Sequence, residues 1–173
     1  MRSFNLTPDL VTGIRAIDEQ HGELLDLANE VVDMPEGHLH PELFELALTF
    51  LVGYTAYHFA AEEVVMTDLD YPQRGQHFDH HRQLQQSVGN LAAEARIKGA
   101  TPACQTEIAR FLNDWIVHHI RESDREMAQF LVTQPIDLEA LILPDIRTLK
   151  LCGAIPIDFD EKFATGTAGV RQR

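Results

Sequence analysis

The sequence predicts an all-α protein: an up-down-up-down four-helix bundle with an N-terminal arm and an irregular C-terminal extension. Three observations support this fold class: long segments whose apolar residues recur at helical spacing, short connections between them, and weak strand signals. A chain of 173 residues, 45% of them hydrophobic, is long enough for one such domain. We expect the arm over residues 1–17, the bundle over 18–132 and the extension over 133–173.

Turn and capping residues separate the four expected helices. Pro41 suits the first turn of the second helix, and the Asp-Tyr-Pro run at 70–72 interrupts the apolar pattern after it. Gly99 is a suitable C-cap for the third helix, and Thr101 followed by Pro102 is typical of a helix start. The expected helices therefore span residues 18–33, 41–69, 72 or 74–98, and 102–131.

The acidic composition limits the partners. Fourteen Lys and Arg against 27 Asp and Glu give a net charge of −13, which argues against nucleic acid or an anionic membrane as partner. No apolar run reaches the ~18 residues of a membrane span. The first residues also lack the apolar core of a secretory signal, so we expect a cytoplasmic location. The two cysteines, Cys104 and Cys152, are too isolated for a disulfide framework or a zinc knuckle.

Histidines and carboxylates occupy inward positions on all four expected helices. On the third helix two histidines stand one turn apart on the apolar stripe, and on the second helix a histidine and a glutamate do the same. A single inward histidine is more often a hydrogen-bonded core residue than a metal ligand, but here several occur together. The inward polar residues are His21, His58, Glu62, His77, His81, His119 and Asp124.

A metal site explains this set of residues. A buried carboxylate without a partner costs several kcal/mol, yet no Lys or Arg lies on the stripes that carry Glu62 and Asp124. Seven candidate ligands exceed what one metal ion in a bundle uses, and they suit two ions bridged by two carboxylates. Imidazole with carboxylate suits iron, zinc, copper or nickel. Asp18 and Gln20 are candidate hydrogen-bond partners of the ligand imidazoles, and Glu63 is expected to face solvent.

Four motifs carry a resemblance to a known family. In chain order they read GIRAIDEQHGELLDLAN, HFAAEEVVM, YPQRGQHFDHH and WIVHHIRESD, and over about residues 4–131 they resemble the bacterial hemerythrins. That resemblance implies two iron ions, Fe²⁺ or Fe³⁺, with an oxo or hydroxo bridge. It further implies that one iron is held by His77, His81 and His119, that the other is held by His21 and His58, and that both are bridged by Glu62 and Asp124.

The resemblance also implies reversible binding of dioxygen, at the iron with only two histidines and beside an apolar pocket. The matching pocket residues are Phe59, Trp115, Ile116 and Ile120. An apolar lining admits a small neutral gas and excludes water, and the alternative for these residues is ordinary bundle core.

We expect an oxygen carrier, for storage or delivery, and not an enzyme. No nucleophile–base pair, phosphate-binding glycine loop or substrate-sized polar cleft is visible in the sequence. A module that senses oxygen or redox state is one alternative. A di-iron oxidase, peroxidase or nitric oxide reductase is another.

The C-terminal extension lies outside the resemblance. It contains Pro135, Pro144 and Pro156 within a stretch rich in Leu and Ile, which is too apolar for a free linker. We expect it to pack back on the bundle, or to contact a protein partner or a second copy of the chain.

Overall fold

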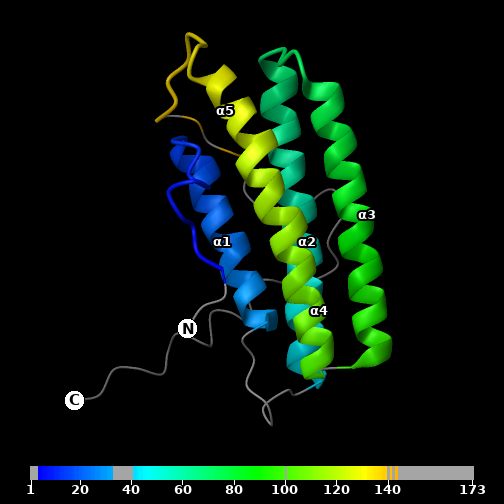
Figure 1. The fold of residues 1–173 in the computed structure, drawn as a ribbon. Helices are drawn as coiled ribbons and strands as arrows, with labels where there is room; N and C mark the ends of the chain where they lie inside the picture. Colours follow the sequence, from blue (N-terminus) through cyan, green and yellow to red (C-terminus); the bar gives the residue numbers. More distant parts are fainter. Residues whose placement is uncertain (1–3, 33–40, 100, 140, 142, 144–173) are drawn as a thin grey trace, which may run out of the picture.

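The computed structural model describes residues 4–32, 41–99, 101–139, 141 and 143, and over them the fold is all-α, as expected. Four long helices alternate in direction, with α1 packed on α2, α2 on α3, and the fourth helix against α1 and α3 (Figure 1). The first three are α1(Arg15–Val32), α2(Pro41–Asp68) and α3(Arg74–Lys98). The fourth comprises α4(Pro102–Leu112), η1(Asn113–Val117), η2(Ile120–Asp124) and α5(Arg125–Leu131).

Capping residues fix the connection between α3 and α4. Gly99, with a φ of 73°, ends α3, and this positive φ is the reason that glycine is favoured there. Thr101 Oγ1 accepts a hydrogen bond from the backbone N–H of Cys104 at 3.2 Å, and Pro102 occupies the first turn of α4. The expected end of the third helix and start of the fourth are therefore confirmed.

The fourth helix contains two π-helical segments, η1 and η2, where we expected an uninterrupted α-helix. One series of its buried positions recurs at intervals of four residues, at Leu112, Ile116, Ile120, Asp124 and Ala128. In an ideal α-helix each such interval drifts by about 40°, or about 160° over the whole series. Wider turns closed by i→i+5 hydrogen bonds absorb this drift and keep one face of the helix toward the core.

The N-terminal arm is held against the bundle and is not a free extended segment. Phe4 is buried, and its backbone N–H and C=O both bond to the side chain of Asn29 on α1, each at 2.8 Å. Further along, Leu10 is buried and the Asp9 carboxylate accepts hydrogen bonds from Arg121 of η2 at 2.6 and 3.0 Å. The arm therefore ties α1 to the fourth helix.

Asp18 sets the start of α1, which begins at Arg15 and not at residue 18. Its carboxylate accepts hydrogen bonds from the backbone N–H groups of Thr12 and Gly13 at 2.7 and 3.0 Å. Asp18 thus fixes the turn that leads from the arm into the helix and does not bond to an imidazole.

Replacing Asn29 by alanine is expected to lower the free energy of unfolding by about 1–3 kcal/mol, because two buried backbone groups of Phe4 lose their partners. Urea unfolding followed by circular dichroism measures this change. The matched control is Asn90→Ala, an exposed position on α3 where we expect a change below about 0.5 kcal/mol. Equal stabilities of the two variants would contradict the anchoring role of Asn29.

A second apolar cluster at one end of the bundle receives the first part of the C-terminal extension. Leu143 is buried there, and Leu138 and Leu141 pack against the cluster. The bundle contributes mainly Ile14, Ile17, Ala61, Val65, Met66, Tyr71, Met127, Ala128 and Leu131. The remainder of the extension, residues 144–173, lies outside the described residues. Within the described part of the chain, every helix is too short or too polar to cross a membrane.

Candidate metal centre

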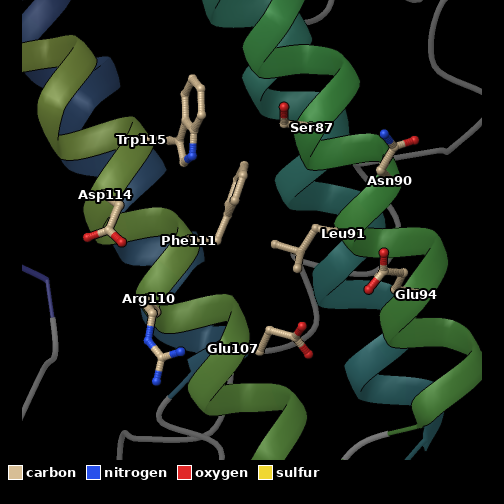
Figure 2. Close-up of a pocket in the computed structure, with 9 residues that line it drawn as sticks. All are labelled: Ser87, Asn90, Leu91, Glu94, Glu107, Arg110, Phe111, Asp114 and Trp115. Carbon is tan, nitrogen blue, oxygen red and sulfur yellow. The ribbon is translucent and has the colours of Figure 1, made fainter.

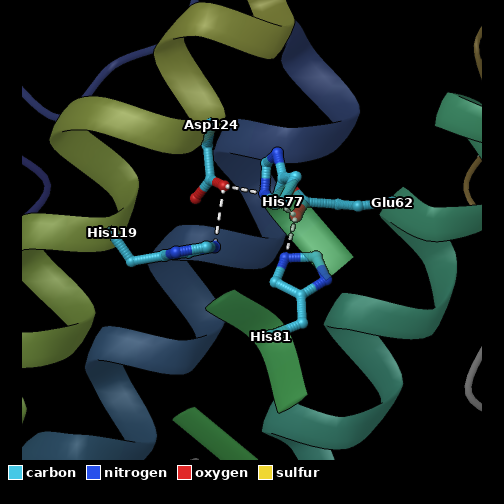
Figure 3. A group of neighbouring side chains, drawn as sticks. All are labelled: Glu62, His77, His81, His119 and Asp124. Atoms are coloured by element: carbon cyan, nitrogen blue, oxygen red, sulfur yellow. Dashed lines mark ion pairs between the residues drawn. The ribbon is translucent and has the colours of Figure 1, made fainter. Parts of the chain in front are cut away.

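Five of the predicted site residues converge in the bundle core from α2, α3 and the fourth helix (Figure 3). The Asp124 Oδ1 atom lies 3.1 Å from the Nε2 atoms of both His77 and His119. The Glu62 Oε2 atom lies 3.3 Å from His81 Nε2. The ligand atoms of these five residues all lie within 4.8 Å of one another, close enough to hold one metal ion.

His21 of α1 and His58 of α2 form a second group with the same two carboxylates. His21 Nε2 lies 3.2 Å from Asp124 Oδ2, and His58 Nε2 lies 3.7 Å from Glu62 Oε1. Each carboxylate therefore turns one oxygen toward each histidine group. The structure brings together all seven residues singled out in the sequence, with three histidines on one side of the carboxylates and two on the other.

Helix geometry explains how these side chains share one face. On α2, His58 and Glu62 are four residues apart, and so are the two histidines of α3, which places each pair one α-helical turn apart. His119 and Asp124 are five residues apart, which in an α-helix would separate them by about 140°. The segment η2 lies between them and closes one turn over five residues, so both side chains reach the core.

The buried polar atoms of the cluster fit a pair of cations. All seven residues are buried, and their contacts with one another lack hydrogen-bond geometry. Among the described residues, the Nε2 atoms of the five histidines and all four oxygens of Glu62 and Asp124 have no hydrogen-bond partner. Leaving nine such atoms unsatisfied in a dry core would cost far more than a domain can tolerate. A metal ion in each group would satisfy them together.

Burial also opposes the charges of these carboxylates. Burial, with the neighbouring charge of Asp124, raises the pKa of Glu62 to about 8. Burial raises the pKa of Asp124 as well, but the imidazoles of His119, His21 and His77 outweigh it and hold that pKa well below its ordinary value. Two adjacent carboxylates in a dry core resist being charged together unless cations offset them. Bound metal ions would supply that positive charge.

Two of the histidines are oriented by hydrogen bonds from their other ring nitrogen. His58 Nδ1 lies 3.0 Å from Gln20 Oε1, so Gln20 is a partner of a candidate ligand, although it bonds to His58 and not to its sequence neighbour His21. His81 Nδ1 lies 3.0 Å from Glu63 Oε1. The expectation that Glu63 faces only solvent is wrong: its side chain is 34% exposed and its carboxylate turns inward to His81.

Three of the four predicted pocket residues, Phe59, Ile116 and Ile120, are buried in the bundle core. Phe59 is buried and stacks on His81 with ring centroids 4.0 Å apart, and its ring also lies 5.4 Å from that of His119. Ile116 and Ile120 are buried on the fourth helix, three residues before and one residue after His119.

The placement of Trp115 in the pocket is wrong, because its side chain is 47% exposed. It belongs to η1, where the wider turn gives less rotation per residue, so the α-helical spacing from Leu112 does not bring it inward. Trp115 instead stacks with Phe111 at 6.2 Å and points into a surface groove of about 430 Å³ between α3 and α4 (Figure 2). Lys98 bonds to two carboxylates of that groove, Glu94 and Glu107.

The fold and the cluster define a four-helix bundle protein with a buried cation-binding site built from histidines and carboxylates. The family described as Hemerythrin HHE cation binding domain matches residues 12–131. The chain therefore belongs to this family, which confirms the resemblance carried by the four motifs.

Individual relatives agree with this assignment. The chain is 32% identical over 117 residues to a bacteriohemerythrin of Pseudomonas aeruginosa, covering 67% of this chain and 73% of the relative. It is 29% identical over 121 residues to a bacteriohemerythrin of Stenotrophomonas maltophilia, covering 69% and 76%. A third, from Methylococcus capsulatus, is 25% identical over 114 residues, covering 66% and 85%.

Proposed function

We propose that the protein binds dioxygen reversibly at a non-heme di-iron centre and serves as an oxygen carrier, for storage or delivery, without catalysing a reaction. The observation that carries the proposal is the position of Glu62 and Asp124, each with one oxygen toward each of two histidine groups. Such a pair of carboxylates suits two bridged metal ions. The resemblance to bacterial hemerythrins supports iron as the metal and dioxygen as the ligand.

The two histidine groups have different roles in this proposal. His77, His81 and His119 would hold one iron, whereas His21 and His58 would hold the other, which would have one protein nitrogen fewer and therefore room for a small ligand. Ferrous ions, when bound, supply the electrons by which dioxygen is held. Imidazole and carboxylate donors suit iron in both of its common oxidation states.

Apolar side chains around the cluster protect it from water. Phe59 lies against the rings of His58 and His81, at centroid distances of 5.7 and 4.0 Å. Ile116 and Ile120 close the core on the side of the fourth helix. A dry lining keeps out the water and protons that promote irreversible oxidation, while dioxygen, being small and neutral, can enter.

The proposal is tested by loading the protein with ferrous iron anaerobically, exposing it to air and recording the visible absorption spectrum. A carrier develops a new band in air and loses it again under argon, over repeated cycles. A single irreversible change would contradict reversible binding. Continuous oxygen consumption in the presence of a reductant would favour a di-iron oxidase instead.

Replacing Ile120 by alanine is expected to leave the iron content unchanged and to accelerate autoxidation about tenfold or more, because the cavity admits water beside His119. The rate is measured as the decay of the oxygenated spectrum in air. Ile108→Ala provides a matched control, since Ile108 is equally buried in the same core but lies twelve residues before Ile120, about 18 Å away along the fourth helix. The pocket assignment would be overturned if both variants autoxidised at the same rate.

A further inference from the structure

The outer nitrogens of two candidate ligands meet chemically different partners. His58 Nδ1 lies 3.0 Å from the amide oxygen of Gln20, and His81 Nδ1 lies 3.0 Å from a carboxylate oxygen of Glu63. Each contact joins neighbouring helices of the bundle, and each partner is adjacent in sequence to another cluster residue, His21 or Glu62. Gln20 is buried, whereas the Glu63 side chain is 34% exposed. The partners also differ in charge, because an amide is neutral and a carboxylate carries a formal negative charge.

The Gln20 amide contacts Tyr57 with its nitrogen and His58 with its oxygen. The amide Nε2 donates to the Tyr57 hydroxyl at 3.1 Å, which leaves the carbonyl oxygen toward His58. That oxygen can only accept a hydrogen bond, so His58 Nδ1 must carry the hydrogen. The neutral ring then presents an unprotonated Nε2 toward the centre, as a metal ligand requires.

Glu63 imposes the same tautomer on His81 but adds negative charge. A carboxylate attracts the Nδ1 hydrogen more strongly than an amide does, which makes the ring a more basic, more electron-donating ligand. A more electron-donating ligand stabilises the higher oxidation state of the metal that it binds. His81 belongs to the three-histidine group, whereas His58 belongs to the two-histidine group.

We propose that Gln20 and Glu63 are positioning residues that make the two metal ions electronically unequal, with the ion of the two-histidine group the harder one to oxidise. The inference rests on the proposed di-iron centre. It explains why His58 is paired with a neutral amide, whereas His81 is paired with a carboxylate. The iron with room for dioxygen is thereby the one that better retains its ferrous state.

Exchanging the two partners tests the proposal. Glu63→Gln and Gln20→Glu are prepared singly and together, loaded with iron, and titrated anaerobically with a reductant while the potential and the EPR signal of the odd-electron state are recorded. Glu63→Gln is expected to raise the mean potential and Gln20→Glu to lower it, each by about a tenfold change in the one-electron equilibrium, ~59 mV. Each single variant brings the reduction potentials of the two ions closer together, so the odd-electron state becomes less populated.

The double variant is expected to restore the population of the odd-electron state, because the two partners are again unequal. A purely structural role for these residues would not shift the potential in opposite directions. Glu19→Gln and Gln86→Glu make the same charge changes at exposed positions of α1 and α3 and should leave both potentials nearly unchanged. Shifts of equal size in these controls, or shifts of one sign in both single variants, would overturn the inference.

Tyrosine variants provide a second test that adds no charge to the core. Tyr57→Phe removes the hydroxyl that orients Gln20, and about tenfold faster release of one iron to a chelator is expected. Tyr54→Phe is the matched control, because Tyr54 donates to Glu23 instead and the two rings lie 5.5 Å apart on the same helix. Equal release rates in both variants would contradict the role of Tyr57. A wild-type chain that takes up no iron would instead overturn the proposed function.

Discussion

Asp124→Asn is expected to lower the affinity for both metal ions by at least about 100-fold, leaving the chain nearly free of iron after reconstitution. The reason is geometric: Oδ1 of Asp124 faces His77 and His119, whereas Oδ2 faces His21. An amide has one oxygen and no negative charge, so it can neither serve both groups nor offset two cations. A histidine replacement would affect one group directly, whereas this replacement affects both.

Iron and protein are measured in the same sample after anaerobic loading and removal of free metal. Asp114→Asn is the matched control, because Asp114 lies on the same helix with its side chain exposed, and this variant should bind as much iron as the unaltered protein. Retention of a full complement of iron by Asp124→Asn would refute the bridging role of this carboxylate.

Removal of the metal is expected to lower the thermal midpoint of unfolding by about 16–32 °C. With free ferrous iron at a thousand times its Kd, binding linkage stabilises the folded chain by about 4 kcal/mol for each ion, or about 8 kcal/mol for two ions. Each kcal/mol shifts the midpoint by about 2–4 °C for a chain of this size. The physical source is the set of buried imidazole and carboxylate atoms that lack hydrogen-bond partners within the described residues.

Thermal unfolding recorded anaerobically, with iron and then with excess chelator, measures this shift. The Asp124→Asn variant is the internal control, because a chain that binds no metal should not respond to the chelator. Identical midpoints for the iron-loaded and chelated wild-type protein would mean that the core tolerates its buried charges without a cation, and the proposed centre would then be untenable.

The sequence predicts most of the fold and the residues of the cluster because both depend on spacing. Two residues four apart on an α-helix share a face, so the spacing alone places His58 with Glu62, and His77 with His81, toward the core. The requirement that a buried carboxylate has a partner then connects residues on separate helices. The exact way in which the two carboxylates divide their oxygens could not be predicted, because it depends on side-chain rotation within the packed core.

Spacing is misleading where the helix ceases to be α-helical. Trp115 is expected inside because it lies three residues after the buried Leu112, and the wide turn of η1 instead leaves it 47% exposed. The unbroken series of four-residue intervals from Leu112 onward is a sequence signal for this departure, since an α-helix cannot keep such a series on one side.

Hydrogen bonds to the outer nitrogens are harder to predict from the sequence. Glu63 follows Glu62 directly and should point about 100° away from it, which makes solvent its expected environment. His81 on the neighbouring helix α3 lies in that direction, however, and its Nδ1 atom is 3.0 Å from the Glu63 carboxylate. Partners of this kind depend on how close two helices approach, and a single sequence contains no direct measure of that distance.

The π-helical turn of η2 is one residue wider than an α-helical turn. His119 and Asp124 are five residues apart, and deleting one residue between them would leave four, the spacing that an α-helical turn keeps on one face. Glu122 is exposed between them, so its loss would remove no side chain from the core. A chain shortened by this one residue could therefore return to an α-helix and still turn the histidine and the acid inward.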